Sequence, residues 1–257
     1  ELHRHTTEEL RADINRAVRQ FQHSYQIFEG YEHLLAAKIN GMFVEAMQSV
    51  LAHSPRVAEN KRSLLHMQLA VHTYLLHGVH DKLFAHFKAV NAPKDQQLQR
   101  YRQALKWRTV QSFGAPKGFE ASYTTSIMLM SRLSDYTSPY QKMHFMSEVI
   151  NSVTQEAAVA QSTEDITADT LVPLLAYVVA QSAAPCLHAN VHYATALCPE
   201  AIEHTELSYA RTTFEVALEC VMVEGRGLDE GVEGPARPTG TADGSSNGHA
   251  PQPPLPF

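Results

Sequence analysis

The chain has 257 residues, of which 44% are hydrophobic and 19% charged, and its formal net charge is -6 at pH 7. This is the composition of an ordinary globular protein with a sizeable core, and the negative charge excludes a nucleic-acid surface, which needs clustered Lys and Arg. No uncharged apolar run reaches the roughly eighteen residues that cross a bilayer, so any membrane contact is expected to be peripheral.

The first part of the chain predicts two antiparallel amphipathic helices. Apolar residues recur every three or four positions over 10–28 until Gly30 breaks the pattern. A second stripe of the same period then runs to Ser54 and Pro55, which close it. We interpret residues 1–60 as an N-terminal helical bundle segment.

Residues 61–224 predict a second and larger unit. After Arg62, the apolar spacing indicates a third helix, or a kinked pair around Gly78. We expect it to end before Pro93, because proline lacks the donor that a helix interior needs. A shorter helix is expected around Tyr101.

The remainder of this unit predicts several more helices. Ser138 and Pro139 have the pattern of an N-cap followed by proline at the first helical position. Further helices are expected near residues 123–133, 139–160, 169–182, 186–197 and 206–224. Because no run alternates with period two between turn signals, we predict an all-α fold of at least eight helices, a layered multi-helix domain preceded by the N-terminal helical pair.

From Gly225 onward the composition shifts to Gly, Pro, Ser, Asp and Thr, with few large apolar residues. Such a segment cannot offset the entropy of ordering, so residues 225–257 are expected to be a disordered tail. The tail ends in P-Q-P-P-L-P-F. Proline-dense runs of this kind either dock on SH3 or WW domains or serve as linkers.

Asp169 stands just before the apolar run L-V-P-L-L-A-Y-V-V. An aspartate in this position is typical of a helix N-cap, whose carboxylate accepts amide hydrogen bonds and complements the helix dipole. Pro173 would then fall in the first helical turn, where its missing donor costs little. The same position also suits an exposed acidic side chain held at the start of a rigid helix.

A second candidate site lies on the helix that opens at Thr205 and Glu206. Its core stripe includes Phe214, and Tyr209 and Thr212 lie about 100 to 160 degrees from the centre of that stripe, so both should be exposed. The alternative is a tyrosine at a domain edge with no binding role.

The stretch T-E-D-I-T-A-D-T-L-V-P-L-L-A-Y-V-V and the later T-E-L-S-Y-A-R-T-T-F-E-V-A-L-E-C-V together resemble the vacuolar protein sorting nine domain. That domain is a helical module that catalyses guanine-nucleotide exchange on endosomal Rab GTPases. The resemblance implies that the partner is a small GTPase of the endosomal class (Rab-five subfamily). It also implies that the protein carries out no covalent chemistry, needs no cofactor, and is cytoplasmic and recruited to early endosomal membranes.

The resemblance also assigns roles to residues. It implies that Asp169 is an acidic finger reaching into the nucleotide site of the GTPase, and that Tyr209 contacts the switch region. Glu206 helps to shape the same surface, with Thr212 and Pro173 as supporting positions. A carboxylate offered to the P-loop lysine opposes the phosphate and disfavours magnesium, so the nucleotide leaves faster.

A third element is the helix that follows Pro139, where Lys142 and Met143 match a pattern of the same family. The resemblance implies that this helix flanks an apolar groove that receives the switch regions, with Lys142, Met143, Met146 and Ile150 as GTPase-binding residues. Apolar residues at this spacing are otherwise typical of a core.

The sequence departs from the family pattern at two positions of the last helix. Thr205 replaces a usual glycine, and Ala210 stands where a second aromatic residue is common. These departures bear on the level of activity and on Rab preference. The alternative function is a helical interaction scaffold that binds a GTPase or adaptor proteins without exchange activity.

Metal and redox chemistry have little support in the sequence. Among fifteen histidines, His188 and His192 have the i, i+4 spacing of paired ligands, whereas the histidines of the third helix scatter round it. The glutamate of an H-E-x-x-H site is absent, so we expect a solvated pair and no metal site. The three cysteines, an odd number without a C-x-x-C pair, predict no disulfide framework and a reducing compartment.

Overall fold

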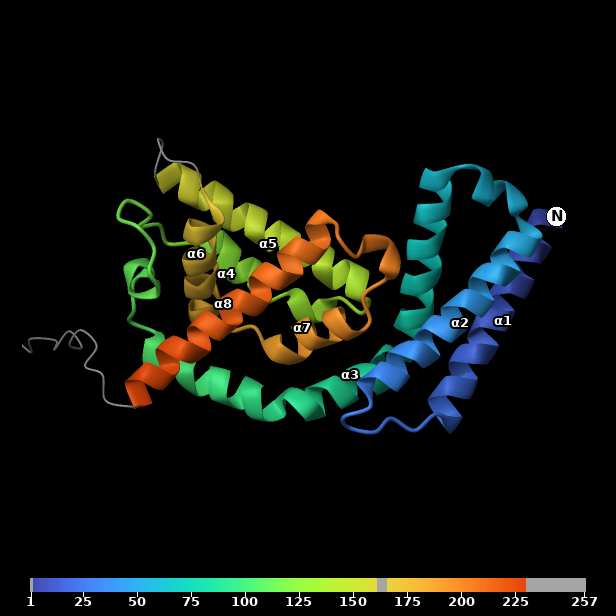
Figure 1. Ribbon diagram of the computed structural model, residues 1–257, viewed down its shortest axis with the longest axis horizontal. Coiled ribbons are helices and arrows are strands. Elements are labelled where there is room, and N and C mark those ends of the chain that lie inside the picture. The colour runs from blue at the N-terminus through green and yellow to red at the C-terminus, as the bar shows by residue number, and fades with distance from the viewer. Residues whose placement is uncertain (1, 161–165, 230–257) are drawn as a thin grey trace, which may run out of the picture.

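The computed structural model describes residues 2–160 and 166–229, with the backbone alone at residues 2–7, 9 and 10 (Figure 1). These residues form eight α-helices and four short 3-10 turns, with no strand among them, so the predicted all-α class is confirmed. From residue 230 on, the predicted disordered tail and its proline motif lie outside the described residues.

Three helices form the first layer, on the right of Figure 1. They are α1 (Leu2–Ser24), α2 (Glu32–His53) and the N-terminal half of α3 (Lys61–Leu105), with a 3-10 turn at Pro55–Glu59 between the last two. The predicted helical pair is present, and α1 lies close against α3. Gly78 permits this approach, because a Cβ there would lie only 2.8 Å from a methyl group of Val18.

Helix α3 is longer than predicted, because it continues through Pro93 to Leu105 and absorbs the short helix expected around Tyr101. Proline at residue 93 removes the hydrogen bond that the carbonyl group of Ala89 would accept. Ala89 is exposed, so water can serve that carbonyl group instead. The helix therefore continues past Pro93, and Figure 1 shows α3 curving along the lower edge of the molecule.

The second layer contains the other helices, packed on the C-terminal half of α3 (Figure 1). They are α4 (Thr124–Met130), α5 (Pro139–Ala160), α6 (Ala168–Gln181), α7 (Leu187–Ala196) and α8 (Glu206–Asp229). Three 3-10 turns lie between them, at Val110–Phe113, Leu133–Asp135 and Glu200–Ile202. Ser138 caps α5 as predicted, since its Oγ accepts a hydrogen bond from the amide of Gln141.

Helix α8 runs to Asp229, so the prediction that the chain becomes disordered from Gly225 is wrong for its first five residues, 225–229. Gly225 is buried against the ring of Tyr101, and a Cβ at this position would overlap that ring. The glycine therefore serves helix packing rather than helix termination, since its missing side chain lets α8 meet α3.

Two apolar cores lie along α3. The larger core joins α4, α5, α6 and α8 with the end of α3, and the smaller core joins α1 and α2 with residues 71–87 of α3. Tyr193 and Leu197, from α7 and the residue that follows it, complete the smaller core. The predicted boundary at residue 60 therefore separates two sequence segments but does not separate two cores.

Candidate functional site

Asp169 is the second residue of α6, and its side chain is exposed. The predicted N-cap role is wrong for Asp169, because the residue in the N-cap position is Thr167. The carbonyl oxygen of Thr167 accepts hydrogen bonds from the amides of Thr170 and Leu171, at 3.1 and 2.9 Å. Asp169 is thus two residues further into the helix than predicted, where its negative charge still complements the helix dipole.

Pro173 lies in the second turn of α6, not in the first turn as predicted. In a regular helix the amide of residue 173 would donate to the carbonyl group of Asp169, and proline has no such donor. The backbone carbonyl of Asp169 is therefore left without its helical partner. Since Asp169 is exposed, water or a bound protein can serve that group.

Two apolar residues hold the start of α6 in place. Ile166 and Leu171 flank the N-cap at the positions of a hydrophobic staple, and both pack on the larger core. The hydroxyl groups of Thr167 and Thr170 lie 3.4 Å apart. The first turn of the helix is thereby fixed while the carboxylate of Asp169 projects into solvent.

The second site begins at the N-terminus of α8. Thr205 caps this helix, since its Oγ1 accepts from the amide of Leu207 at 3.3 Å and donates to the carbonyl oxygen of Ile202 at 2.7 Å. Threonine in place of the usual glycine thus adds two hydrogen bonds to the start of the helix. Glu206 follows as the first helical residue and is exposed.

Tyr209 and Thr212 are both exposed, as predicted from the helical phase, and the side chain of Tyr209 is 54% exposed. The hydroxyl group of Thr212 donates to the carbonyl oxygen of Ser208, so it is occupied within its own helix. On the opposite side of α8, Phe214 and Ala210 are buried in the larger core. The helix therefore presents a polar and aromatic strip to solvent.

The helices that carry the two candidate sites, at Asp169 and at Tyr209, pack against each other. Helix α6 packs against α8, and α5 packs against both (Figure 1). Asp169 and Tyr209 are carried by different helices, and the larger core fixes the position of each.

The predicted GTPase-binding role of Lys142 is not compatible with its burial, since its side chain is 0% exposed. Its ammonium group donates to Asn190 Oδ1 at 2.6 Å and to the carbonyl oxygen of Leu133 at 3.4 Å. The same nitrogen lies 4.8 Å from the ring centroid of Phe84 and 5.8 Å from that of Tyr193. Burial lowers the pKa of Lys142 to about 8. The residue ties α5 to α3 and α7.

Met143, Met146 and Ile150 are also buried, at 0%, 0% and 9% exposure. All three belong to the larger core, so the prediction that they line an open groove is wrong. Their spacing places them on the face of α5 that meets the neighbouring helices, as expected of core residues. A side chain in this position can act on a GTPase only through the helices around it.

Sequence reasoning missed the polar side chain that holds the end of α6, and the segment that follows it, on α3. The guanidinium group of Arg102 donates to the carbonyl oxygens of Val179 and Ala184 and to Ser182 Oγ. Burial lowers the pKa of Arg102 to about 10, while the nearby Asp95 raises it. These contacts lie about eighty positions apart in the chain, and spacing within one helix gives no signal for them.

His188 and His192 are not a solvated pair as predicted. Burial lowers the pKa of His188 to about 4. His192 lies with its ring centroid 4.9 Å from that of Phe87, and its Nδ1 is 2.9 Å from Nδ2 of Asn91. Within residues 2–160 and 166–229, no group of three or more His, Cys, Asp or Glu side chains is placed to hold a metal ion.

The three cysteines, Cys186, Cys198 and Cys220, are free thiols. Burial raises the pKa of each, so all three are protonated and weakly reactive at neutral pH. None of the described helices combines the length and apolarity needed to cross a membrane.

Residues 123–223 match the family model described as the Vacuolar sorting protein 9 (VPS9) domain. The match confirms the resemblance seen in the sequence, and it spans α4 to α7 and residues 206–223 of α8. It includes Asp169, Pro173, Glu206, Tyr209 and Thr212, whereas α1, α2 and α3 lie outside it. A VPS9 domain implies guanine-nucleotide exchange on a Rab GTPase, without covalent chemistry.

Proposed function

We propose that this VPS9-domain protein is a guanine-nucleotide exchange factor for small GTPases of the endosomal Rab-five subfamily, with Asp169 as an acidic finger that promotes GDP release. The observation that carries the proposal is an exposed carboxylate on the fixed first turn of α6, inside the matched residues. A finger of this kind needs a rigid base and a free charged end, and α6 provides both.

The mechanism is competition for charge. A GTPase holds its nucleotide largely through a P-loop lysine and a magnesium ion that pair with the phosphates. The carboxylate of Asp169 would take the place of a phosphate oxygen beside that lysine and would disfavour the metal.

Tyr209 is the proposed main contact with the switch region. Its large exposed ring offers apolar area together with a hydroxyl group, the combination that often anchors protein interfaces. Glu206 and Thr212 lie within one turn on the same helix and would complete this contact. Lys142, Met143, Met146 and Ile150 would support the surface from the core rather than touch the GTPase.

We also propose where the protein acts and what else it binds. A Rab-five subfamily substrate would place it in the cytoplasm, recruited to early endosomal membranes. The proline motif at residues 251–257 is the proposed ligand of an SH3 or WW domain, which would bring adaptor proteins to the same place.

The test measures release of fluorescent GDP from a panel of endosomal Rab GTPases. We expect one of them to be accelerated by the protein, and Asp169→Ala to lower that acceleration about tenfold or more, which corresponds to about 1.4 kcal/mol of barrier. Tyr209→Ala should weaken the effect by raising the concentration of protein needed for half-maximal exchange. Circular dichroism would verify that each variant remains folded.

Asp81→Ala is a matched control, because it removes an exposed aspartate on α3, outside the matched residues. It should leave the rate unchanged. If no Rab responds, or if Asp169→Ala is as active as the parent, the acidic finger is wrong. Binding of a Rab without acceleration would then favour the interaction scaffold.

A further inference from the structure

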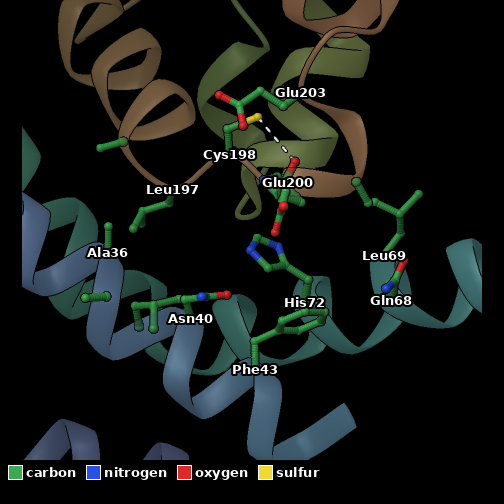
Figure 2. A pocket seen from close by; sticks show the side chains of 15 residues that line it. Ala36, Asn40, Phe43, Gln68, Leu69, His72, Leu197, Cys198, Glu200 and Glu203 are labelled. Carbon is green, nitrogen blue, oxygen red and sulfur yellow. Dashed lines mark hydrogen bonds between the residues drawn. The ribbon is translucent and has the colours of Figure 1, made fainter.

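A cavity of about 780 Å³ lies at the junction of the two layers. Its walls come from α2, from α3 and from the segment that joins α7 to the 3-10 turn Glu200–Ile202 (Figure 2). Pockets that bind small organic molecules have volumes of about 300 to 1,000 Å³, are mostly apolar, and contain a few placed polar groups. The cavity has a volume in this range, its lining combines apolar and polar side chains, and none of the proposed contacts with a GTPase is among its lining residues.

His72 provides a polar group on the floor of the cavity. The side chain is only 7% exposed, and its buried Nδ1 has no hydrogen-bond partner within the described part of the chain. Burial lowers the pKa of His72 to about 4, so the imidazole is neutral at pH 7. The ring of Phe43 meets that of His72 edge-on, with 5.6 Å between their centroids. A buried nitrogen left unpaired is costly, and because Nδ1 is shielded from the cavity, a ligand would meet the imidazole through its other nitrogen, Nε2.

The walls of the cavity include both apolar and polar side chains, and its rim is acidic. Ile39, Phe43, Leu69 and Leu197 contribute apolar surface, while the lining side chains include two glutamates and no lysine or arginine. In Figure 2 the carboxylate of Glu200 points toward the imidazole of His72 from across the cavity.

The two rim glutamates are available to a ligand. Glu200 and Glu203 are exposed, and neither carboxylate makes an ion pair with a described residue. Burial raises the pKa of the Cys198 thiol, Arg211 lowers it and Glu203 raises it, so Arg211 lies nearby, although it is not among the lining residues. The two charged side chains that line the cavity are both acidic.

We propose that this cavity binds a small organic cation, an ammonium group carried on an apolar body. The apolar body would lie between Phe43, Leu69 and Leu197, with the ammonium group at Glu200 and Glu203. His72 would accept or donate one hydrogen bond at the floor of the cavity. An anion would be repelled at the rim, and a neutral molecule would gain no attraction there.

A bound ligand would also restrain the approach to α8. The 3-10 turn that bears Glu200 is hydrogen-bonded to the cap of α8, since Thr205 donates to the carbonyl oxygen of Ile202. Amides of residues 200–209 should therefore exchange their hydrogens more slowly in the complex. Binding at this place does not require exchange activity, so it can be measured whether or not the protein acts on a Rab.

The experiment uses three probes with one apolar body and different charge, namely 4-phenylbutylamine, 4-phenylbutanol and 4-phenylbutyrate. Calorimetric titration of the full chain at pH 7 should show that the amine binds about tenfold more tightly than the alcohol and that the carboxylate binds least. Replacing both rim residues, Glu200→Gln with Glu203→Gln, should remove the advantage of the amine. Both positions are exposed, so this variant should remain folded.

Two further variants separate binding from folding. Glu45→Gln with Glu59→Gln removes the same charge at exposed positions outside the cavity and should leave the affinity unchanged. His72→Phe removes the unpaired nitrogen, so it should raise Tm while weakening the amine severalfold, whereas a purely structural histidine would change Tm alone. The proposal fails if no probe binds, if the alcohol or carboxylate matches the amine, or if the rim variant keeps its preference.

Discussion

Lys142 shows how a charged side chain can be kept in a core. Its ammonium group has one strong acceptor in Asn190 and lies over two aromatic rings, yet it has lost its water. Burial favours the neutral amine and lowers the pKa to about 8, from 10.5 in the unfolded chain. The folded state therefore binds fewer protons than the unfolded state between these two pH values.

This difference predicts how stability changes with pH. Between pH 8 and 10 the contribution of Lys142 to the free energy of unfolding should rise with pH, by up to about 1.4 kcal/mol per unit. Urea unfolding at several pH values, with Lys142→Met beside the parent, would measure it. The rise should be absent from the variant. A variant with the same slope as the parent would show that the ammonium group is not desolvated in solution.

For individual residues, the sequence correctly predicted which side chains of one helix are exposed, but it did not predict that a charged side chain is buried. Helical phase placed Tyr209 and Thr212 outside and Phe214 inside, because one helix alone determines which residues share a face. The partners of Lys142 come from α3 and α7, which are far from it in sequence. No pattern within α5 could show that these partners would surround it.

Glycine and proline have different effects in these helices from those that sequence rules predict. Pro93 and Pro173 lie inside α3 and α6, where local rules predict a helix end or a first turn. Contacts with neighbouring helices keep α3 and α6 helical at these two positions, although each proline lacks an amide donor. The sequence thus predicted that the helices exist and misplaced their ends, since the ends depend on tertiary contacts.

Gly225 gives a direct test of helix packing. Because a Cβ at this position would overlap the ring of Tyr101, Gly225→Ala must push α8 away from α3. We expect a loss of about 1 to 3 kcal/mol in the free energy of unfolding, despite the higher helix propensity of alanine. Thermal unfolding would measure this. Gly227→Ala, two residues later with no atom near its Cβ position, is the matched control and should be neutral or stabilising.

Helix α7 is capped by a residue of another helix. Both carboxylate oxygens of Asp95, on α3, accept hydrogen bonds from the first turn of α7, from the amides of His188 at 2.8 Å and Ala189 at 3.3 Å. Asp95→Ala should therefore destabilise the protein by about 1 to 2 kcal/mol. Hydrogen exchange should locate the loss at residues 187–190, and an effect spread evenly over the chain would contradict a capping role.

At the scale of the whole molecule, the N-terminal helices complete a core rather than form a separate unit. They cover Leu75, Leu76, Leu83 and Phe87 of α3, all 0% exposed. A chain of residues 61–257 would expose these side chains at about 1.5 to 3 kcal/mol each, which approaches the whole stability of a domain. We expect it to aggregate or to melt far below the parent in thermal unfolding and size-exclusion chromatography.

A chain of residues 1–229 is the control, since it retains every described residue and should melt like the parent. Equal melting of the chain of residues 61–257 and the parent, with both monomeric, would show instead that the two cores are independent. Helical periodicity could predict which face of α1, α2 and α3 is apolar, but not which elements those faces meet. The contribution of Tyr193 to the smaller core was for that reason not predictable.

The place of Tyr193 also has a consequence for synthesis. Side chains of α1, α2 and α3 leave the ribosome first, but the smaller core is completed by a residue roughly a hundred positions later. At about 5 to 20 residues per second, that gap lasts about 5 to 20 seconds. During this interval the part of α3 that Tyr193 covers, at Phe84 and Phe87, is open on a nascent chain. This part of α3 is where we expect a chaperone to bind, and where slow translation between α3 and α7 would favour aggregation.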